Sequence, residues 1–153
     1  MVEQKSSYQE LRGDASGSAP MHQIDRIIVV LDGSALAAQA IPPAASLAEE
    51  LGISMVLLGL LTAAPGRPAR DDALHRSLTE GYLQAMSKPL QRRGLELQCQ
   101  IDDMQGTVLQ TLLAAHGLLL TTRAVVSVDT PLSRLALACR DEQPHAVLIK
   151  EVS

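Results

Sequence analysis

The sequence predicts a single α/β domain built on a mainly parallel sheet. Short apolar runs typical of buried strands alternate along the chain with longer segments of helical periodicity. The 153 residues are enough for one domain, and 46% hydrophobic with 20% charged residues is a globular composition. Strand and helix units of this size join parallel strands by right-handed crossovers, which places helices on both faces of the sheet.

The first unit is the clearest. Residues 27–31 form an unbroken apolar run, as expected for a strand covered on both faces. The segment Asp32-Gly33-Ser34 then supplies a turn and a helix N-cap at Ser34, and helical spacing continues to a C-cap at Gly52. Pro42-Pro43 interrupts this pattern, so that either the helix kinks there or its regular part starts at Pro42.

The second unit begins with an apolar strand over residues 53–61 and a Pro- and Gly-containing loop over 62–69. A helix follows from Asp71 and Asp72 to Gly94. Its expected buried face consists of Leu74, Leu78, Tyr82, Ala85, Met86 and Leu90. The third strand alternates apolar and polar residues from Leu95 to Ile101, which predicts a half-exposed strand at a sheet edge.

The last elements are shorter. We expect a helix from Gly106-Thr107 to His116-Gly117, a strand over 118–122, a helix from Thr130-Pro131 and a final strand over 146–152. Between them, the valine-rich residues 124–128 favour an extended conformation. The polar residues 1–22 predict a flexible tail ahead of a domain that spans 23–153.

Composition argues against several classes of function. A net charge of −4 without a dense Lys/Arg cluster makes nucleic acid an unlikely partner. The longest apolar stretch, residues 51–64, falls short of the ~20 residues that span a bilayer, and no secretion signal is visible, so we expect a cytoplasmic protein that does not bind membranes. Cys99 and Cys139 are then expected to be buried, reduced thiols.

Motifs for catalysis and metal binding are missing. The sequence has no Gly-rich phosphate loop of the G-x-x-x-x-G-K-S/T or G-x-G-x-x-G type and no G-x-S-x-G nucleophile elbow. The four histidines lie on separate segments without ligand spacing. The pairs Asp71-Asp72 and Asp102-Asp103 are interpreted as a helix start and an exposed turn. We therefore predict no catalytic residue, no metal and no enzyme activity.

Four stretches in order resemble a universal stress protein domain over residues 26–150. They are IIVVLDGS (27–34), LAEELG (47–52), GYLQAMSKPLQRRGLELQCQI (81–101) and PHAVLIK (144–150). The resemblance implies a flavodoxin-like, doubly wound five-stranded sheet of order 3-2-1-4-5. It also implies a homodimer made by pairing the last strands, here Val147, Leu148 and Ile149.

The chain departs from the family's ATP-binding pattern. One branch of the family binds ATP between the acidic turn after the first strand and a G-x2-G-x9-G loop after the fourth. Residues 121–139 contain no glycine, and Thr122, Val125 and a residue near Leu132 stand where glycines are expected. Glycine matters there because it reaches positive φ and lets backbone N–H groups approach phosphates closely.

Two functions follow. The first is a dimeric, non-enzymatic regulatory or stress-response module without a cofactor, which acts through a protein partner. The alternative is an ATP- or AMP-binding stress protein with a variant phosphate site, formed by Asp32, Gly33, Ser34, Arg123, Thr130 and Ser133. In the first case the same residues have ordinary roles: an Asx-type turn and cap at Asp32 and Ser34, a first-turn helix residue at Ser133, and a solvated loop charge at Arg123.

Overall fold

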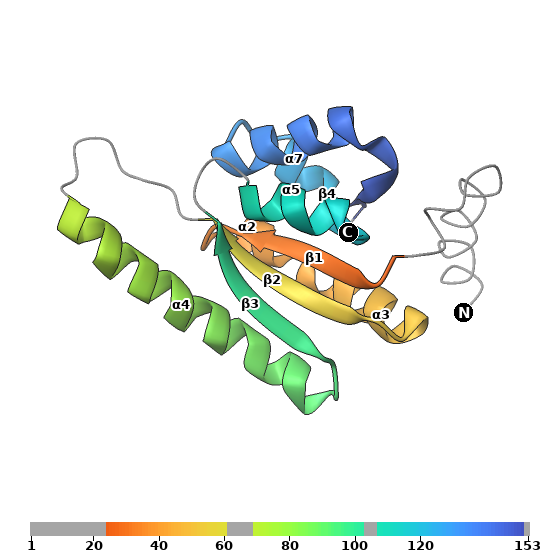
Figure 1. Cartoon of the computed structure of the whole chain (residues 1–153), viewed down its shortest axis with the longest axis horizontal. Coiled ribbons are helices and arrows are strands. Elements are labelled where there is room, and N and C mark those ends of the chain that lie inside the picture. Colours follow the sequence, from red (N-terminus) through yellow and green to blue (C-terminus); the bar gives the residue numbers. More distant parts are fainter. Residues whose placement is uncertain (1–23, 61–68, 103–106, 152–153) are drawn as a thin grey trace.

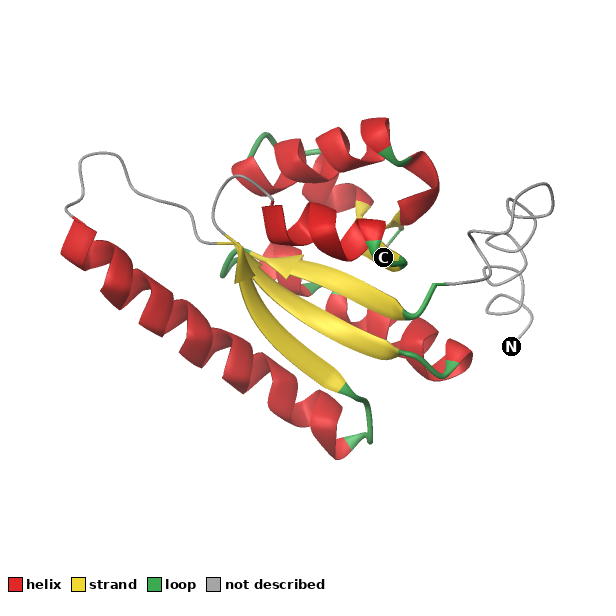
Figure 2. Cartoon of the chain, viewed as in Figure 1, coloured by secondary structure: helices red, strands yellow, loops and turns green. Residues whose placement is uncertain are grey.

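The computed structural model describes residues 24–60, 69–102 and 107–151. Its centre is a five-stranded parallel sheet in the order β3-β2-β1-β4-β5, which confirms the predicted fold class and strand order (Figures 1 and 2). The strands are β1 (Arg26–Leu31), β2 (Ser54–Leu60), β3 (Leu97–Asp102), β4 (Gly117–Thr122) and β5 (Val147–Lys150). The predicted tail over 1–22 and nearly all of the loop over 62–69 lie outside the described residues.

Helices cover both faces of the sheet. The helices are α2 (Ala35–Ala38), α3 (Ile41–Leu51), α4 (Ala69–Arg92), α5 (Thr107–Ala114), α6 (Arg123–Val126) and α7 (Pro131–Glu142), with a 3-10 turn η2 (Pro144–Ala146). The strand order runs outward from β1 to β3 and then back across to β4 and β5. Because crossovers are right-handed, this reversal puts α3 and α4 on one face and α5 and α7 on the other. Figure 1 shows α4 and α7 on opposite sides of the sheet.

The sequence left open whether a helix kinks at Pro42-Pro43 or starts there, and the structure shows that it starts there. α2 ends at Ala38, and α3 begins at Ile41 with Pro42 and Pro43 in its first turn. The first N–H groups of a helix have no partner within the helix, so proline loses no hydrogen bond there. α3 ends at Gly52, whose φ of 69° is the predicted left-handed C-cap.

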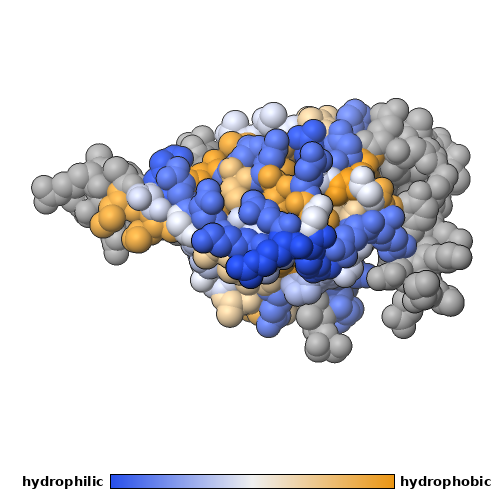
Figure 3. Space-filling model, turned by 90° about the horizontal axis from the view of Figure 1, so that it is seen from below, coloured by the Kyte–Doolittle hydropathy of each residue, from blue (hydrophilic) through white to orange (hydrophobic). Residues whose placement is uncertain are grey.

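The buried face of α4 differs from the prediction. Leu74 and Leu78 are 60% and 64% exposed, and Ala85 is exposed too. Leu90 is buried as predicted and Tyr82 and Met86 are half-buried, but the helix also buries Leu83 and Ser87, which the prediction left out. The two exposed leucines lie on the side of the helix opposite Leu83 and Leu90, away from the sheet. The first turns of α4 also run past the end of the sheet (Figure 1). Viewed from the α4 side, a hydrophobic area lies at the end where this helix projects (Figure 3).

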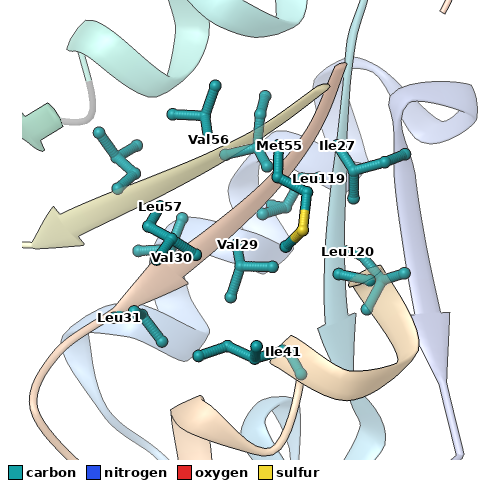
Figure 4. Packing of buried hydrophobic residues seen from close by; sticks show 14 of the residues in the cluster. Ile27, Val29, Val30, Leu31, Ile41, Met55, Val56, Leu57, Leu119 and Leu120 are labelled. Atoms are coloured by element: carbon teal, nitrogen blue, oxygen red, sulfur yellow. The ribbon is translucent and has the colours of Figure 1, made fainter. Parts of the chain in front are cut away.

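The core is aliphatic, as the composition predicts. Ile27, Ile28 and Val29 of β1 are fully buried, and side chains of β2 and β4 pack against them. Figure 4 shows this packing, with Ile41 of α3 against the strands. Because none of its side chains is exposed, β1 needs cover on both faces, and only a position in the middle of the sheet provides it.

The close approach at Gly117 gives a test of this packing. A Cβ at Gly117 would lie 2.6 Å from the Leu112 carbonyl oxygen and 2.6 Å from Ile28 Cδ1. Because the carbonyl belongs to the backbone of α5, Gly117→Ala should lower the free energy of unfolding by about 1–3 kcal/mol in chemical denaturation. Gly81→Ala is the matched control, since a Cβ at Gly81 meets nothing within 4 Å. It should raise stability by about 0.5–1 kcal/mol, and equal effects of the two substitutions would contradict this packing.

Candidate functional site

The candidate site is the edge where β1 and β4 end. These neighbouring strands lead into connections that run in opposite directions across the sheet. In open α/β sheets, ligands bind outside the carboxyl ends of the strands at such a switch point. β1 continues through residues 32–34 into α2, and β4 continues from Thr122 into α6. The two short helices contact each other across this edge.

Asp32, Gly33 and Ser34 form a closed local turn. Asp32 Oδ1 accepts hydrogen bonds from the Ser34 backbone N–H at 3.0 Å and from Ser34 Oγ at 2.6 Å. Ser34 Oγ in turn accepts from the Ala37 N–H at 3.1 Å and caps α2. Gly33 has a φ of 88°, which its lack of a Cβ permits. These are the Asx-type turn and helix cap that the sequence allowed as the ordinary role of these residues.

The segment after β4 is helical, and the predicted extended conformation over 124–128 is wrong. Thr122 Oγ1 accepts from the Val125 N–H at 3.2 Å and starts α6. Val125 is 3% exposed, and α6 contacts α2, β4 and α7. The hydroxyl cap and the burial of one valine outweigh the weak β-preference of the valine-rich sequence. A helical turn therefore occupies the place of the expected phosphate loop.

Thr130 and Ser133 bind each other. Thr130 Oγ1 accepts from the Ser133 N–H at 3.1 Å, and Ser133 Oγ accepts from the Thr130 N–H at 2.9 Å. Ser133 Oγ also donates to the Thr130 carbonyl oxygen at 2.9 Å, and Ser133 is 2% exposed. This reciprocal capping box starts α7 and uses both hydroxyls. Ser133 is thus a first-turn residue with a defined structural role.

Arg123 is neither in a loop nor unpaired. It is the first residue of α6, and its Nε lies 2.5 Å from Glu151 Oε2, just after β5. Its side chain is 63% exposed. This ion pair could not be predicted from the sequence, because Arg123 and Glu151 are far apart in the chain and meet only when β5 pairs with β4.

The six predicted site residues form three separate groups. Asp32, Gly33 and Ser34 form one, Thr130 and Ser133 the second, and Arg123 with Glu151 the third. In the described part of the chain, the hydrogen bonds and ion pairs of these side chains stay within each group. The fold brings the groups to one edge of the sheet but does not make them converge on one point.

One polar residue at this edge was misinterpreted from sequence. Asp102 was expected in an exposed turn, yet it ends β3 and is fully buried. Its Oδ2 accepts from the Leu109 N–H of α5 at 2.9 Å, where the positive end of the helix dipole favours a carboxylate. Asp103 lies outside the described residues.

The two cysteines are both free, but only one is buried. Cys139 on α7 is 1% exposed, whereas Cys99 on β3 is exposed, contrary to the prediction of two buried thiols. An edge strand leaves part of its side chains without cover. Burial and, to a smaller extent, the nearby carboxylates of Glu142 and Asp102 together raise the pKa of Cys139 to about 11. A thiol with such a pKa stays protonated and unreactive at neutral pH.

Two properties of the described residues bear on metal binding and on membrane insertion. Within 24–60, 69–102 and 107–151, no three His, Cys, Asp or Glu side chains gather as metal ligands would. No helix in these ranges combines the length and apolar character that crossing a membrane requires.

The fold is that of solved universal stress protein structures. A Burkholderia pseudomallei protein of that family shares 20% identity with a TM-score of 0.59, over 85% of this chain and 96% of its own. UspA of Lactobacillus plantarum shares 14% with a TM-score of 0.56, over 84% and 98%. A universal stress protein in complex with cAMP shares 14% with a TM-score of 0.61, over 86% and 99%. No family model and no curated protein matches the sequence.

The buried Cys139 predicts a loss of stability at alkaline pH. Its thiol ionises near pH 9 in the unfolded chain and near pH 11 in the folded one. The contribution of the protonated Cys139 thiol to the free energy of unfolding is therefore complete below about pH 9 and is lost as pH rises toward 11. In chemical denaturation at several pH values, the free energy of unfolding should fall less between about pH 9 and 11 for Cys139→Ala than for the parent chain. Parallel pH profiles would contradict the assignment.

Proposed function

We propose that this protein is a dimeric, non-enzymatic module of the universal stress protein type, which acts through protein contacts and does not bind ATP through the family's loop. The proposal depends on the backbone conformation between β4 and the end of α7. Among the described residues, positive φ occurs only at Gly33, Gly52, Gly94 and His116. None of these lies in the connection that would have to hold the phosphates.

A phosphate nest needs successive backbone N–H groups that point into one concavity, and a left-handed residue supplies the required bend. In this chain, the N–H groups of Val125 and Ser133 instead point at the hydroxyls of Thr122 and Thr130. A phosphate would have to displace these caps, each worth about 1 kcal/mol. This cost supports a domain that has kept the family's frame without its nucleotide site.

The same groups argue for a role without catalysis. The hydroxyls of Ser34 and Ser133 are engaged in caps, and among the contacts described for them none is with a histidine or cysteine. A serine nucleophile needs a base within hydrogen-bond reach. We therefore infer that the domain works as a cytoplasmic regulatory partner of another protein, with no cofactor.

In the described part of the chain β5 is an outer strand of the sheet, which supports a homodimer. β5 pairs with β4 on one side and ends the sheet on the other, and Val147, Leu148 and Ile149 are half-buried. An exposed apolar edge strand tends to pair with another strand. Pairing with the β5 of a second copy would continue the sheet across a two-fold axis.

The alternative function is adenine nucleotide binding at a variant site. It draws on Asp32, which is half-buried at the switch point, and on the cAMP complex among the similar structures. ATP or AMP would then contact Asp32, Gly33 and Ser34 through the adenosine. Arg123, Thr130 and Ser133 would have to leave their present partners to reach the phosphates.

Nucleotide titration separates the two functions. We expect no saturable heat with ATP, AMP or cAMP in calorimetry and no rise in melting temperature at millimolar nucleotide. A binder would be stabilised by about 2.7 kcal/mol at a hundred times its Kd. A rise of that size in the parent chain, lost in Asp32→Ala, would establish the alternative and refute the proposal.

A charge placed on β5 tests whether the homodimer forms through this strand. Ile149→Lys should separate the β5-paired dimer in sedimentation velocity, because the two-fold axis brings like charges together. Gln98→Lys, on the opposite edge strand β3, is the matched control and should leave the dimer intact. An assembly state of the parent chain that Ile149→Lys leaves unchanged would exclude this interface.

A further inference from the structure

The outer side of α4 carries a second apolar stripe. It consists of Leu74, Leu78, Gly81 and Ala85, all exposed, and the two leucines are 60% and 64% exposed. The spacing of four, three and four residues follows the seam of a heptad repeat. The proposed function uses none of these residues.

The stripe faces away from the rest of the domain. At about 100° per residue it lies nearly opposite the face that buries Leu83, Ser87 and Leu90. A Cβ at Gly81 would meet nothing within 4 Å, so no described neighbour lies against the helix at this position. In Figure 3 a hydrophobic area lies at the projecting end of α4, next to polar surface on the side toward the middle of the helix.

We propose that this stripe pairs, antiparallel, with the same stripe of a second copy, about a two-fold axis that passes between Thr79 and Glu80. In this register Leu74 lies opposite Ala85 of the other copy, and Leu78 lies opposite Gly81. Each large side chain therefore faces a small one. Such alternation lets two helices approach closely and interdigitate, which two leucines facing each other would prevent.

The dipole of α4 favours the antiparallel arrangement, because the positive end of each helix dipole then lies beside the negative end of the other. The positions that flank the stripe are His75 and Tyr82 on one side and Ser77 and Gln84 on the other, so no pair of Lys, Arg, Asp or Glu of the same sign is brought together.

This contact is independent of the β5 dimer. It uses another surface and another two-fold axis, and neither contact needs the other to form. If both form, each copy touches two neighbours, and the assembly is a closed tetramer or a longer chain of copies. With Ile149→Lys in place, the α4 contact alone would still give a dimer.

The test is sedimentation velocity of the full chain and of Ile149→Lys over a concentration range up to roughly 100 µM. Leu74→Gln with Leu78→Gln should weaken self-association of Ile149→Lys at least about tenfold. Val128→Gln is the matched control, because Val128 is an exposed apolar residue elsewhere in the chain, and it should have no effect. An Ile149→Lys variant that stays monomeric throughout would overturn the α4 contact and leave the β5 dimer untouched.

Gly81→Leu tests the register. A leucine there should raise the melting temperature of the monomer, because it favours the helix and meets no neighbour in the same chain. It should nevertheless weaken association at least about tenfold, because Leu78 of the other copy needs that space. Tighter association of Gly81→Leu would show an unspecific apolar contact and would overturn the proposed register.

Discussion

Side-chain capping at the carboxyl ends of the strands is the interaction on which the rest of this structure depends. Ser34 caps α2, Asp102 accepts from the first turns of α5, Thr122 caps α6 and Thr130 caps α7. Each cap satisfies an N–H group that a helix start leaves without a partner. The same caps use the hydroxyls and carboxylates that a ligand at this edge would need. In the proposed function, the groups that begin the helices are thus the groups that leave no place for a phosphate.

Fold and site therefore rest on different parts of the sequence. The sheet rests on apolar runs such as residues 27–31, and these suffice for a domain that aligns with universal stress protein structures at identities of 14–20%. A phosphate site rests on a few backbone positions with special conformations. Thr122 and Val125 give the chain after β4 a helical turn instead. A domain can in this way keep its architecture while its binding edge changes.

The sequence predicted most of the fold because burial on both faces leaves a strong pattern. The strands, the cap at Ser34 and the helix start at Thr130 follow from that pattern and from local capping rules, whereas the sheet order was implied by the resemblance to universal stress proteins. The failures concern long-range contacts. The outward leucines of α4, Leu74 and Leu78, have the spacing of a core face, but they lie opposite the helix face that packs on the sheet and are exposed. The burial of Asp102 and the ion pair between Arg123 and Glu151 depend on strand pairings that no local pattern reveals.

The most direct measurement of the central claim is an amide NMR titration with ATP. The N–H groups of Ser34, Ala37, Val125 and Ser133 report each cap, since each donates to a side-chain oxygen in the free protein. If these oxygens keep the N–H groups, their resonances should not move at millimolar ATP. Saturable shifts of the Val125 and Ser133 amides together with Ser34 would show that phosphate replaces the caps. The proposed loss of the nucleotide site would then be wrong.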